Sequence, residues 1–140
     1  MRIILDTNIL LSALLSPGGA PADLLQSWER KTFTLVACDE LIRELREVSG
    51  RAFFRARLRA SAAELLAAGI REFSLFCRDV PSGPVAPDPG DSYLLALAEA
   101  SQADFLVCGD KGLLALGHHK STRILAAAAM VDTLKAQDRD

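Results

Sequence analysis

The sequence has 140 residues, of which 50% are hydrophobic and 24% are charged, and its formal net charge is −2. This length and composition are typical of one soluble globular domain, which we expect to span residues 1–140. No apolar stretch approaches the roughly 18 residues of a membrane-spanning helix, so no membrane association is expected. The first strand begins at once, which leaves no room for a cleavable signal peptide. Because the three cysteines lie in apolar contexts, we expect reduced thiols and a cytoplasmic location.

The first predicted strand spans residues 2–5 and ends on the polar triplet Asp6-Thr7-Asn8. A continuous apolar run this short is typical of a fully buried strand in a parallel sheet. In open sheets of this kind, ligands bind in the crevice beyond the carboxyl ends of the strands. The sequence therefore places Asp6 where such a fold has its chemistry.

The next elements follow from hydrophobic spacing and from breaks at glycine and proline. Apolar residues at helical spacing predict a helix over residues 9–14, capped by Thr7 or Asn8, and a second helix that begins near Pro21. A β-rich run predicts a strand over residues 32–37, and the helix after it ends at Gly50. Strands and helices thus alternate along this part of the chain.

The middle of the chain, residues 51–77, has helical character with a break near Ala60-Ser61. Ser61 and Glu64 match a capping box for the helix after this break. Residues 73–80 fit a helix and an extended chain equally well. Residues 81–90 are rich in proline and glycine, so we expect a surface loop there.

The last part of the chain repeats the alternation of helix and strand. We expect a helix from Asp91, a strand over residues 105–108, a short helical turn, a strand over 121–125 and a helix over 126–135. His118 and His119 precede that last strand and are expected to be exposed loop residues rather than metal ligands. The alternation predicts βαβ units, a parallel sheet and right-handed crossovers.

Four carboxylates fall at or near the carboxyl edge of the predicted sheet: Asp6, Glu44, Asp91 and Asp110. Carboxylates that are brought together repel one another, so such a site needs cations. Carboxylate oxygens and waters are the ligands that suit Mg²⁺ or Mn²⁺. These ions support phosphodiester cleavage because they activate water and offset charge on the attacking and leaving oxygens.

Each of the four residues also has a purely structural interpretation. Asp6 fits a helix cap, and Asp88 with Pro89 at the next position and Asp91 at the third forms a good helix start. Glu44 shares its helix with glutamates that suit surface ion pairs, and Asp110 fits an ordinary turn. The metal-site hypothesis therefore rests on the set and not on its members.

Six arginines crowd one stretch, where only Glu44 and Glu47 counter them: Arg43, Arg46, Arg51, Arg55, Arg57 and Arg59. They form either a solvated helical face or a basic rim that holds phosphates beside the acidic site. In the second case, the candidate contacts to an RNA backbone are Arg43, Arg46, Arg51 and Lys111.

Four stretches resemble motifs of the PIN-domain family, particularly of the bacterial toxins in toxin–antitoxin pairs. They are IILDTNIL (residues 3–10), LIREL (41–45), DPGD (88–91) followed by LLALA (94–98), and ADFLVCGDK (103–111). The stretches occur in the family's order along nearly the whole chain, so the resemblance is specific.

The resemblance implies a three-layer α/β/α domain with a central parallel sheet. It implies an endoribonuclease that uses one or two Mg²⁺ or Mn²⁺ ions, with Asp6, Glu44, Asp91 and Asp110 as catalytic residues and metal ligands. Asp88 is implied as an auxiliary ligand, Asn8 as a supporting hydrogen-bond partner, and Thr7 and Cys108 as residues around the ligands. The resemblance also implies an RNA substrate, a homodimer and a cognate antitoxin that occludes the site.

Three positions depart from the family's pattern. Cys108 stands where relatives often carry Thr or Ser, which removes a hydroxyl beside the site. Gly112 replaces a frequent further acidic residue, and Gly90 thins an acidic stretch to Asp88 and Asp91. The four principal carboxylates remain, so metal binding is still expected.

Two other functions compete with this hypothesis. A phosphatase of the haloacid dehalogenase type also begins with a strand-terminal aspartate, but it uses a second carboxylate two residues later, where Asn8 stands. A catalytically idle protein-binding module would use its acidic edge only to recognise a basic partner. That module would not be stabilised by a metal ion.

Overall fold

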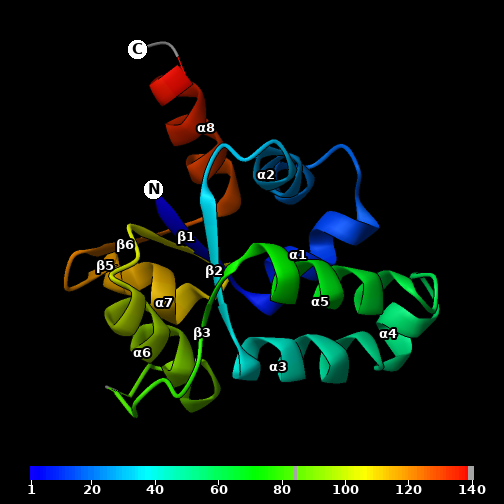
Figure 1. Ribbon diagram of the computed structural model, residues 1–140, viewed down its shortest axis with the longest axis horizontal. Helices are drawn as coiled ribbons and strands as arrows, with labels where there is room; N and C mark the ends of the chain where they lie inside the picture. The colour runs from blue at the N-terminus through cyan, green and yellow to red at the C-terminus, as the bar shows by residue number, and fades with distance from the viewer. Residues whose placement is uncertain (84, 139–140) are drawn as a thin grey trace.

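The computed structural model describes residues 1–83 and 85–138, in which a single sheet has helices on both sides (Figure 1). The strands are β1 (Arg2–Leu5), β2 (Thr34–Cys38), β3 (Leu75–Cys77), β4 (Phe105–Val107), β5 (His118–His119) and β6 (Thr122–Leu125). They lie in the order β3-β2-β1-β4-β6-β5, and every neighbouring pair is parallel except β5 and β6. The predicted central parallel sheet is confirmed.

The helices connect these strands in the expected alternation. They are α1 (Thr7–Leu15), α2 (Ala20–Glu29), α3 (Asp39–Ser49), α4 (Ala52–Arg55), α5 (Ala62–Phe73), the 3₁₀ helix η1 (Pro89–Asp91), α6 (Ser92–Ser101), α7 (Lys111–Leu116) and α8 (Ala127–Asp138). Within the described ranges, no helix has the length and apolar character that crossing a membrane requires.

The strand order determines which helices cover each face of the sheet. From β1 the chain moves outward to β2 and β3, and it then returns past β1 to β4 and β6. Because such crossovers are right-handed, the helices that connect the strands of the two halves lie on opposite faces. Accordingly, α1, α2, α3 and α5 form one connected layer, with α8 against α2, whereas α6 packs on β1 to β4. This is the expected three-layer α/β/α arrangement.

The three central strands, β1, β2 and β4, are covered on both faces, which explains their continuous apolar sequences. Ile3, Leu35 and Leu106 have no exposed surface at all. Burial of each such side chain stabilises the fold by about 1.5–3 kcal/mol relative to exposure. These strands therefore form a rigid base from which the polar residues at their carboxyl ends project.

Two segments form strands that the sequence does not clearly predict. Residues 75–77, in the ambiguous region, pair with the end of β2 as strand β3. The expectation of exposed loop histidines is correct in part: His118 is exposed, but both histidines pair with β6 in an antiparallel hairpin rather than lying in a loop. The His119 side chain is only 19% exposed, since its Nε2 lies 2.7 Å from Glu99 Oε1.

The predicted capping box at the start of α5 is also wrong. Ser61 has helical backbone angles, and its side chain makes no capping hydrogen bond. Glu64 instead accepts a hydrogen bond from Arg46 on α3, at 3.1 Å. The packing of α5 against α3 brings these two side chains together, and this tertiary contact replaces the local one.

Candidate active site

The carboxyl ends of β1 and β4 meet where the strand order reverses, which is the place where open α/β sheets bind ligands. Leu5 is in register with Val107, and the Asp6 N–H donates to the Val107 carbonyl at 3.1 Å. Asp6 directly follows β1 and Asp110 follows β4 by a short turn, so both lie at this edge.

Asp6 is an acidic residue that is almost fully buried, with 6% of its surface exposed. Its Oδ1 accepts the Ile9 N–H at 3.0 Å and caps α1, so the cap is Asp6 and not Thr7 or Asn8. Burial raises the pKa of Asp6 to about 6, the Ile9 hydrogen bond opposes this, and the charges of Asp91 and Glu44 add to the rise. The cap explains how Asp6 is held but leaves its charge uncompensated.

Asp91 stands at the third position of a helix start that Asp88 caps, as the sequence predicts. Asp88 Oδ1 accepts the Gly90 N–H at 3.0 Å and caps η1, whereas α6 begins only at Ser92. The Asp91 carboxylate makes no capping hydrogen bond. Partial burial and the charges of Asp88, Asp110 and Glu44 together raise its pKa to about 6.

Glu44 is the glutamate of α3 that faces the other acidic residues. Its neighbours Glu40 and Glu47 form exposed ion pairs with arginines, at 2.9 and 3.3 Å. The Tyr93 hydroxyl, by contrast, donates to Glu44 Oε1 at 3.3 Å from α6. Burial and the Glu44 charge raise the pKa of Tyr93, so the hydroxyl stays protonated. The structure thus singles out Glu44 among three similar residues.

Tyr93 is a site residue that the sequence analysis missed. It is the sole tyrosine of the chain, and it lies two positions after Asp91 at the start of a predicted helix. This proximity to Asp91 was the one feature of the sequence that could have identified Tyr93. The contact of Tyr93 with Glu44 depends on the packing of α6 against the sheet and could not be predicted.

Asp110 completes the acidic set after β4. Its Oδ2 accepts the Leu113 N–H at 2.8 Å and caps α7, so the interpretation as a simple turn is replaced by a helix cap. Its charge contributes to the raised pKa of Asp91. Four elements therefore bring Asp6, Glu44, Asp91 and Asp110 within electrostatic reach of one another.

Comparison with known proteins agrees with this arrangement. A model of the PIN domain matches residues 2–112, which is most of the chain. The chain belongs to the PIN-domain family. Its fold is similar to the crystal structure of Mycobacterium tuberculosis VapC20, a toxin that cleaves the sarcin–ricin loop, with a TM-score of 0.52 and 17% identity over 86% of this chain and 98% of that chain. No curated protein matches the sequence.

Gly112 of this PIN domain is explained by close packing. A Cβ atom at position 112 would lie 2.9 Å from Pro87 Cβ and 3.1 Å from Asp110 Oδ2. Pro87 is fixed by its backbone, and the Asp110 carboxylate is held by its cap of α7. A larger residue at position 112 would therefore displace the loop before η1 or the Asp110 carboxylate. A glycine at this position therefore lets that loop close over the start of α7.

The residues expected around the ligands differ in their surroundings. Thr7 Oγ1 is buried and has no hydrogen-bond partner in the described ranges. Asn8 is exposed, and the described residues provide no hydrogen bond to its side chain, so its implied supporting role is not seen. Cys108 is fully buried, and burial, with the charges of Asp6, Asp110 and Asp91, raises its thiol pKa to about 12.

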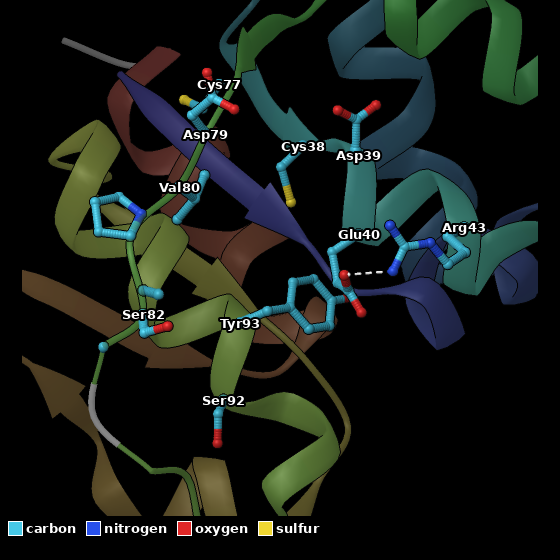
Figure 2. A pocket seen from close by; sticks show the side chains of 13 residues that line it. Cys38, Asp39, Glu40, Arg43, Cys77, Asp79, Val80, Ser82, Ser92 and Tyr93 are labelled. Atoms are coloured by element: carbon cyan, nitrogen blue, oxygen red, sulfur yellow. Dashed lines mark hydrogen bonds and ion pairs between the residues drawn. The ribbon is translucent and has the colours of Figure 1, made fainter.

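A cleft of about 450 Å³ lies beside the acidic residues, at the ends of β2 and β3. Figure 2 shows the Tyr93 ring pointing from α6 toward the first turn of α3, where Glu40 and Arg43 pair. None of the four acidic site residues lines this cleft, so its shape alone does not locate the site. Tyr93 connects the two, because it lines the cleft and also contacts Glu44.

Most of the basic residues that we predicted from the sequence to contact RNA form ion pairs with glutamates. Arg43, Arg46 and Arg51 each form an ion pair, with Glu40, Glu64 and Glu47 respectively. All three pairs are at least half exposed and contribute little to stability. Lys111 is exposed beside Asp110.

The four carboxylates provide the oxygen ligands that a hydrated divalent cation prefers. As they stand, no three His, Cys, Asp or Glu side chains of the described chain are close enough to hold an ion together. Mg²⁺ commonly binds through one or two carboxylates and keeps several waters, so a closer cluster is not required. The raised pKa values of Asp6 and Asp91 indicate uncompensated negative charge that a cation would offset.

Proposed function

We propose that this PIN domain is a metal-dependent endoribonuclease and the toxin of a toxin–antitoxin pair. The observation that carries the proposal is the acidic set at the reversal of the strand order. Two of its members, Asp6 and Asp91, have raised pKa values, and none of the four carboxylates forms an ion pair within the described residues. Unpaired carboxylates with raised pKa values destabilise the fold, and such groups are typical of functional sites, including those that bind cations.

In this proposal, Asp6, Glu44, Asp91 and Asp110 hold Mg²⁺ or Mn²⁺, with Asp88 as an auxiliary ligand. The bound ion would supply Lewis acidity and offset the charge that develops during phosphodiester hydrolysis. Tyr93 orients Glu44 through its hydroxyl, and the Ile9 N–H orients Asp6. These fixed hydrogen bonds preorganise the carboxylates before substrate arrives.

The toxin role and its partners are supported by the likeness of the fold to VapC20 and by the surface of the chain. We propose that the chain forms a homodimer and binds a cognate antitoxin, as toxins of this kind do. An apolar groove between α2 and α5 offers surface for such association, with Leu65 and Phe73 each 69% exposed. Exposed apolar patches of this kind are typical of protein–protein interfaces.

Cleavage of a mixed set of structured and single-stranded RNAs tests the activity. The purified protein is incubated with Mn²⁺, with Mg²⁺ and with EDTA, beside Asp6→Asn and the matched surface control Asp132→Asn. We expect cleavage that needs metal, is lost in Asp6→Asn and is retained in the control. No cleavage, together with no rise in melting temperature on addition of metal, would favour the idle binding module instead.

Expression in a bacterial host tests the toxin role separately. The wild-type chain is expected to arrest growth, Asp6→Asn is expected not to, and the product of a small neighbouring gene is expected to restore growth. A wild-type chain that cleaves RNA in vitro without any effect on growth would point to RNA processing.

A further inference from the structure

A basic and aromatic surface lies on the segment between α3 and α5. Residues 51–60 contain no acidic side chain, and Phe53 is 53% exposed. Beside it stand the exposed side chains of Arg55, Arg57 and Arg59. We call Phe53 and these three arginines the arginine–phenylalanine ridge.

The ridge differs from the rest of the arginine-rich stretch in its charge balance. Arg43, Arg46 and Arg51 each have a glutamate within ion-pair distance. In the part of the chain that the structure describes, the arginines of the ridge have no such partner. The uncompensated positive charge of this stretch is therefore concentrated on the ridge.

The aromatic part of the ridge is a cation–π contact between Arg57 and Phe53. The Arg57 guanidinium lies 3.9 Å from the Phe53 ring centroid, and its Nη1 donates to the Phe53 carbonyl at 2.9 Å. Phe54 meets the Phe53 ring edge-on, with centroids 5.0 Å apart, and packs against the hydrophobic core. Aromatic rings and guanidinium planes held in this way are the surfaces on which unpaired bases stack.

The other part of the ridge borders a small pocket of about 290 Å³. Phe54 and Leu58 give this pocket an apolar lining, and Arg55 and Arg59 also line it. Glu64 lines it as well, but its carboxylate is paired with Arg46. A strand that crosses the ridge would therefore meet a stacking surface and two guanidinium groups that suit phosphates.

Helix α3 connects the ridge to the acidic site. Glu44 lies near the middle of α3, and α4, which carries Phe53, begins just after this helix ends (Figure 1). At 1.5 Å per helical residue, α3 ends roughly 8 Å beyond Glu44, and Phe53 follows four residues after that end. A strand bound at the acidic site reaches the ridge within a few nucleotides.

We propose that the arginine–phenylalanine ridge binds the single-stranded RNA that flanks the scissile phosphate. One base stacks on the pair formed by Phe53 and Arg57, while Arg55 and Arg59 contact phosphates. This assignment rests on the proposed ribonuclease function and moves the RNA contacts away from Arg43, Arg46 and Arg51. An acidic protein is the competing partner, but it would not require an exposed aromatic ring.

Fluorescence anisotropy tests the ridge without cleavage. A short labelled single-stranded RNA is titrated with the full-length protein in EDTA, so that binding is measured alone. The variants are Phe53→Leu and the double variant Arg55→Gln with Arg59→Gln. Their matched controls are Leu116→Ala, at an exposed apolar residue away from the ridge, and Arg30→Gln, at an exposed arginine on a different surface. Melting temperatures confirm that each variant is folded.

We expect Phe53→Leu to weaken binding roughly tenfold with an unchanged salt dependence, because it removes a stacked base. The double arginine variant should lower the slope of log affinity against log salt by about 1.4, since each phosphate contact in a single strand contributes about 0.7. Both controls should bind like the wild type.

The possible failures of the ridge and of the proposed function are distinguishable. Wild-type protein that binds and cleaves RNA, with Phe53→Leu binding RNA as tightly as the wild type, would refute the ridge alone. Polyglutamate that displaces RNA and binds wild type and Phe53→Leu equally well would also refute it, in favour of an acidic partner. Wild-type protein that neither binds RNA nor responds to metal would refute the proposed function.

Discussion

The carboxyl edge of the sheet and the helical end of the molecule, α3 to α5, carry opposite charges and are built differently. At the carboxyl edge, acidic side chains stand next to buried strands, and two of them have pKa values raised to about 6. At the helical end, the arginines are exposed, and half of those in the stretch have glutamate partners. The negative charge of the carboxyl edge therefore destabilises the fold, whereas the positive charge of the helical end has little effect on the free energy of unfolding.

The largest expected effect comes from removing the charge of the most buried acidic residue. Asp6→Asn retains a side-chain oxygen for the Ile9 cap but should lower RNA cleavage by more than about 100-fold. Without metal at about pH 7.5, the same variant should raise the free energy of unfolding by about 2–3 kcal/mol, because the Asp6 pKa is raised from 3.8 to about 6. Denaturant unfolding in EDTA measures this. A variant that is inactive and also destabilised would mean that Asp6 has only a structural role.

The pH dependence of the free energy of unfolding tests the buried charge of Asp6 without any measurement of activity. The folded state binds more protons than the unfolded state between about pH 4 and pH 6, because the pKa of Asp6 is raised on folding. The stability of the wild type relative to Asp6→Asn should therefore fall as the pH rises through this window in EDTA, and level off above about pH 7. Melting curves of both proteins at matched pH measure this difference. A difference that is independent of pH would show that Asp6 titrates normally.

Two glycines beside the site differ in how much room their surroundings leave for a side chain. Gly112→Ala should lower the free energy of unfolding by about 1–2 kcal/mol, because its Cβ would approach Pro87 to 2.9 Å. Gly90→Ala is the matched control, since its Cβ would meet only Asp88 Oδ1, at 3.4 Å. Denaturant titration of both variants measures the contrast. Equal stability would show that the loop before η1 adjusts freely.

Removal of the Tyr93 hydroxyl tests whether Glu44 is positioned from α6. Tyr93→Phe should lower cleavage by about fivefold to tenfold and weaken Mn²⁺ binding, because one hydrogen bond to a carboxylate contributes about 1 kcal/mol. Cleavage rates at several Mn²⁺ concentrations separate the two effects. Unchanged metal dependence would remove Tyr93 from the site.

The smallest effect is expected at an exposed ion pair of the helical end. Arg51→Gln should change the free energy of unfolding by less than about 0.5 kcal/mol, since both partners are more than 60% exposed and the pair is screened by salt. Urea unfolding at low and high salt measures it. A loss of more than about 1 kcal/mol would contradict the contrast between the two regions.

Much of the fold was predictable because buried strands leave a strong signal in the sequence. The apolar run before Asp6 and the run before Cys108 identified two central strands and, with them, the edge where acidic residues gather. The family motifs predicted the same four carboxylates. The short strands β3 and β5 were not predictable, because two or three residues extend only when a paired strand is present.

The details of the site depended on contacts between distant parts of the chain. Helical spacing alone did not distinguish Glu44 from Glu40 and Glu47, and the contact that holds it, from Tyr93 on α6, was not predictable. Likewise, Arg46 and Glu64 are 18 residues apart and pair only because α3 packs on α5. The cap of α1 was assigned to Thr7 or Asn8, although Asp6 provides it, whereas the cap at Asp88 was predicted correctly.

Calorimetric titration of Mn²⁺ into the metal-free protein tests most directly whether the carboxyl edge is one cation site. Wild type, Asp6→Asn, Asp91→Asn and the control Asp132→Asn are compared at about pH 7.5. We predict that wild type and control bind Mn²⁺ equally, and that each site variant loses at least about tenfold in affinity. Binding that is unchanged in both site variants, or absent from the wild type, would contradict the account.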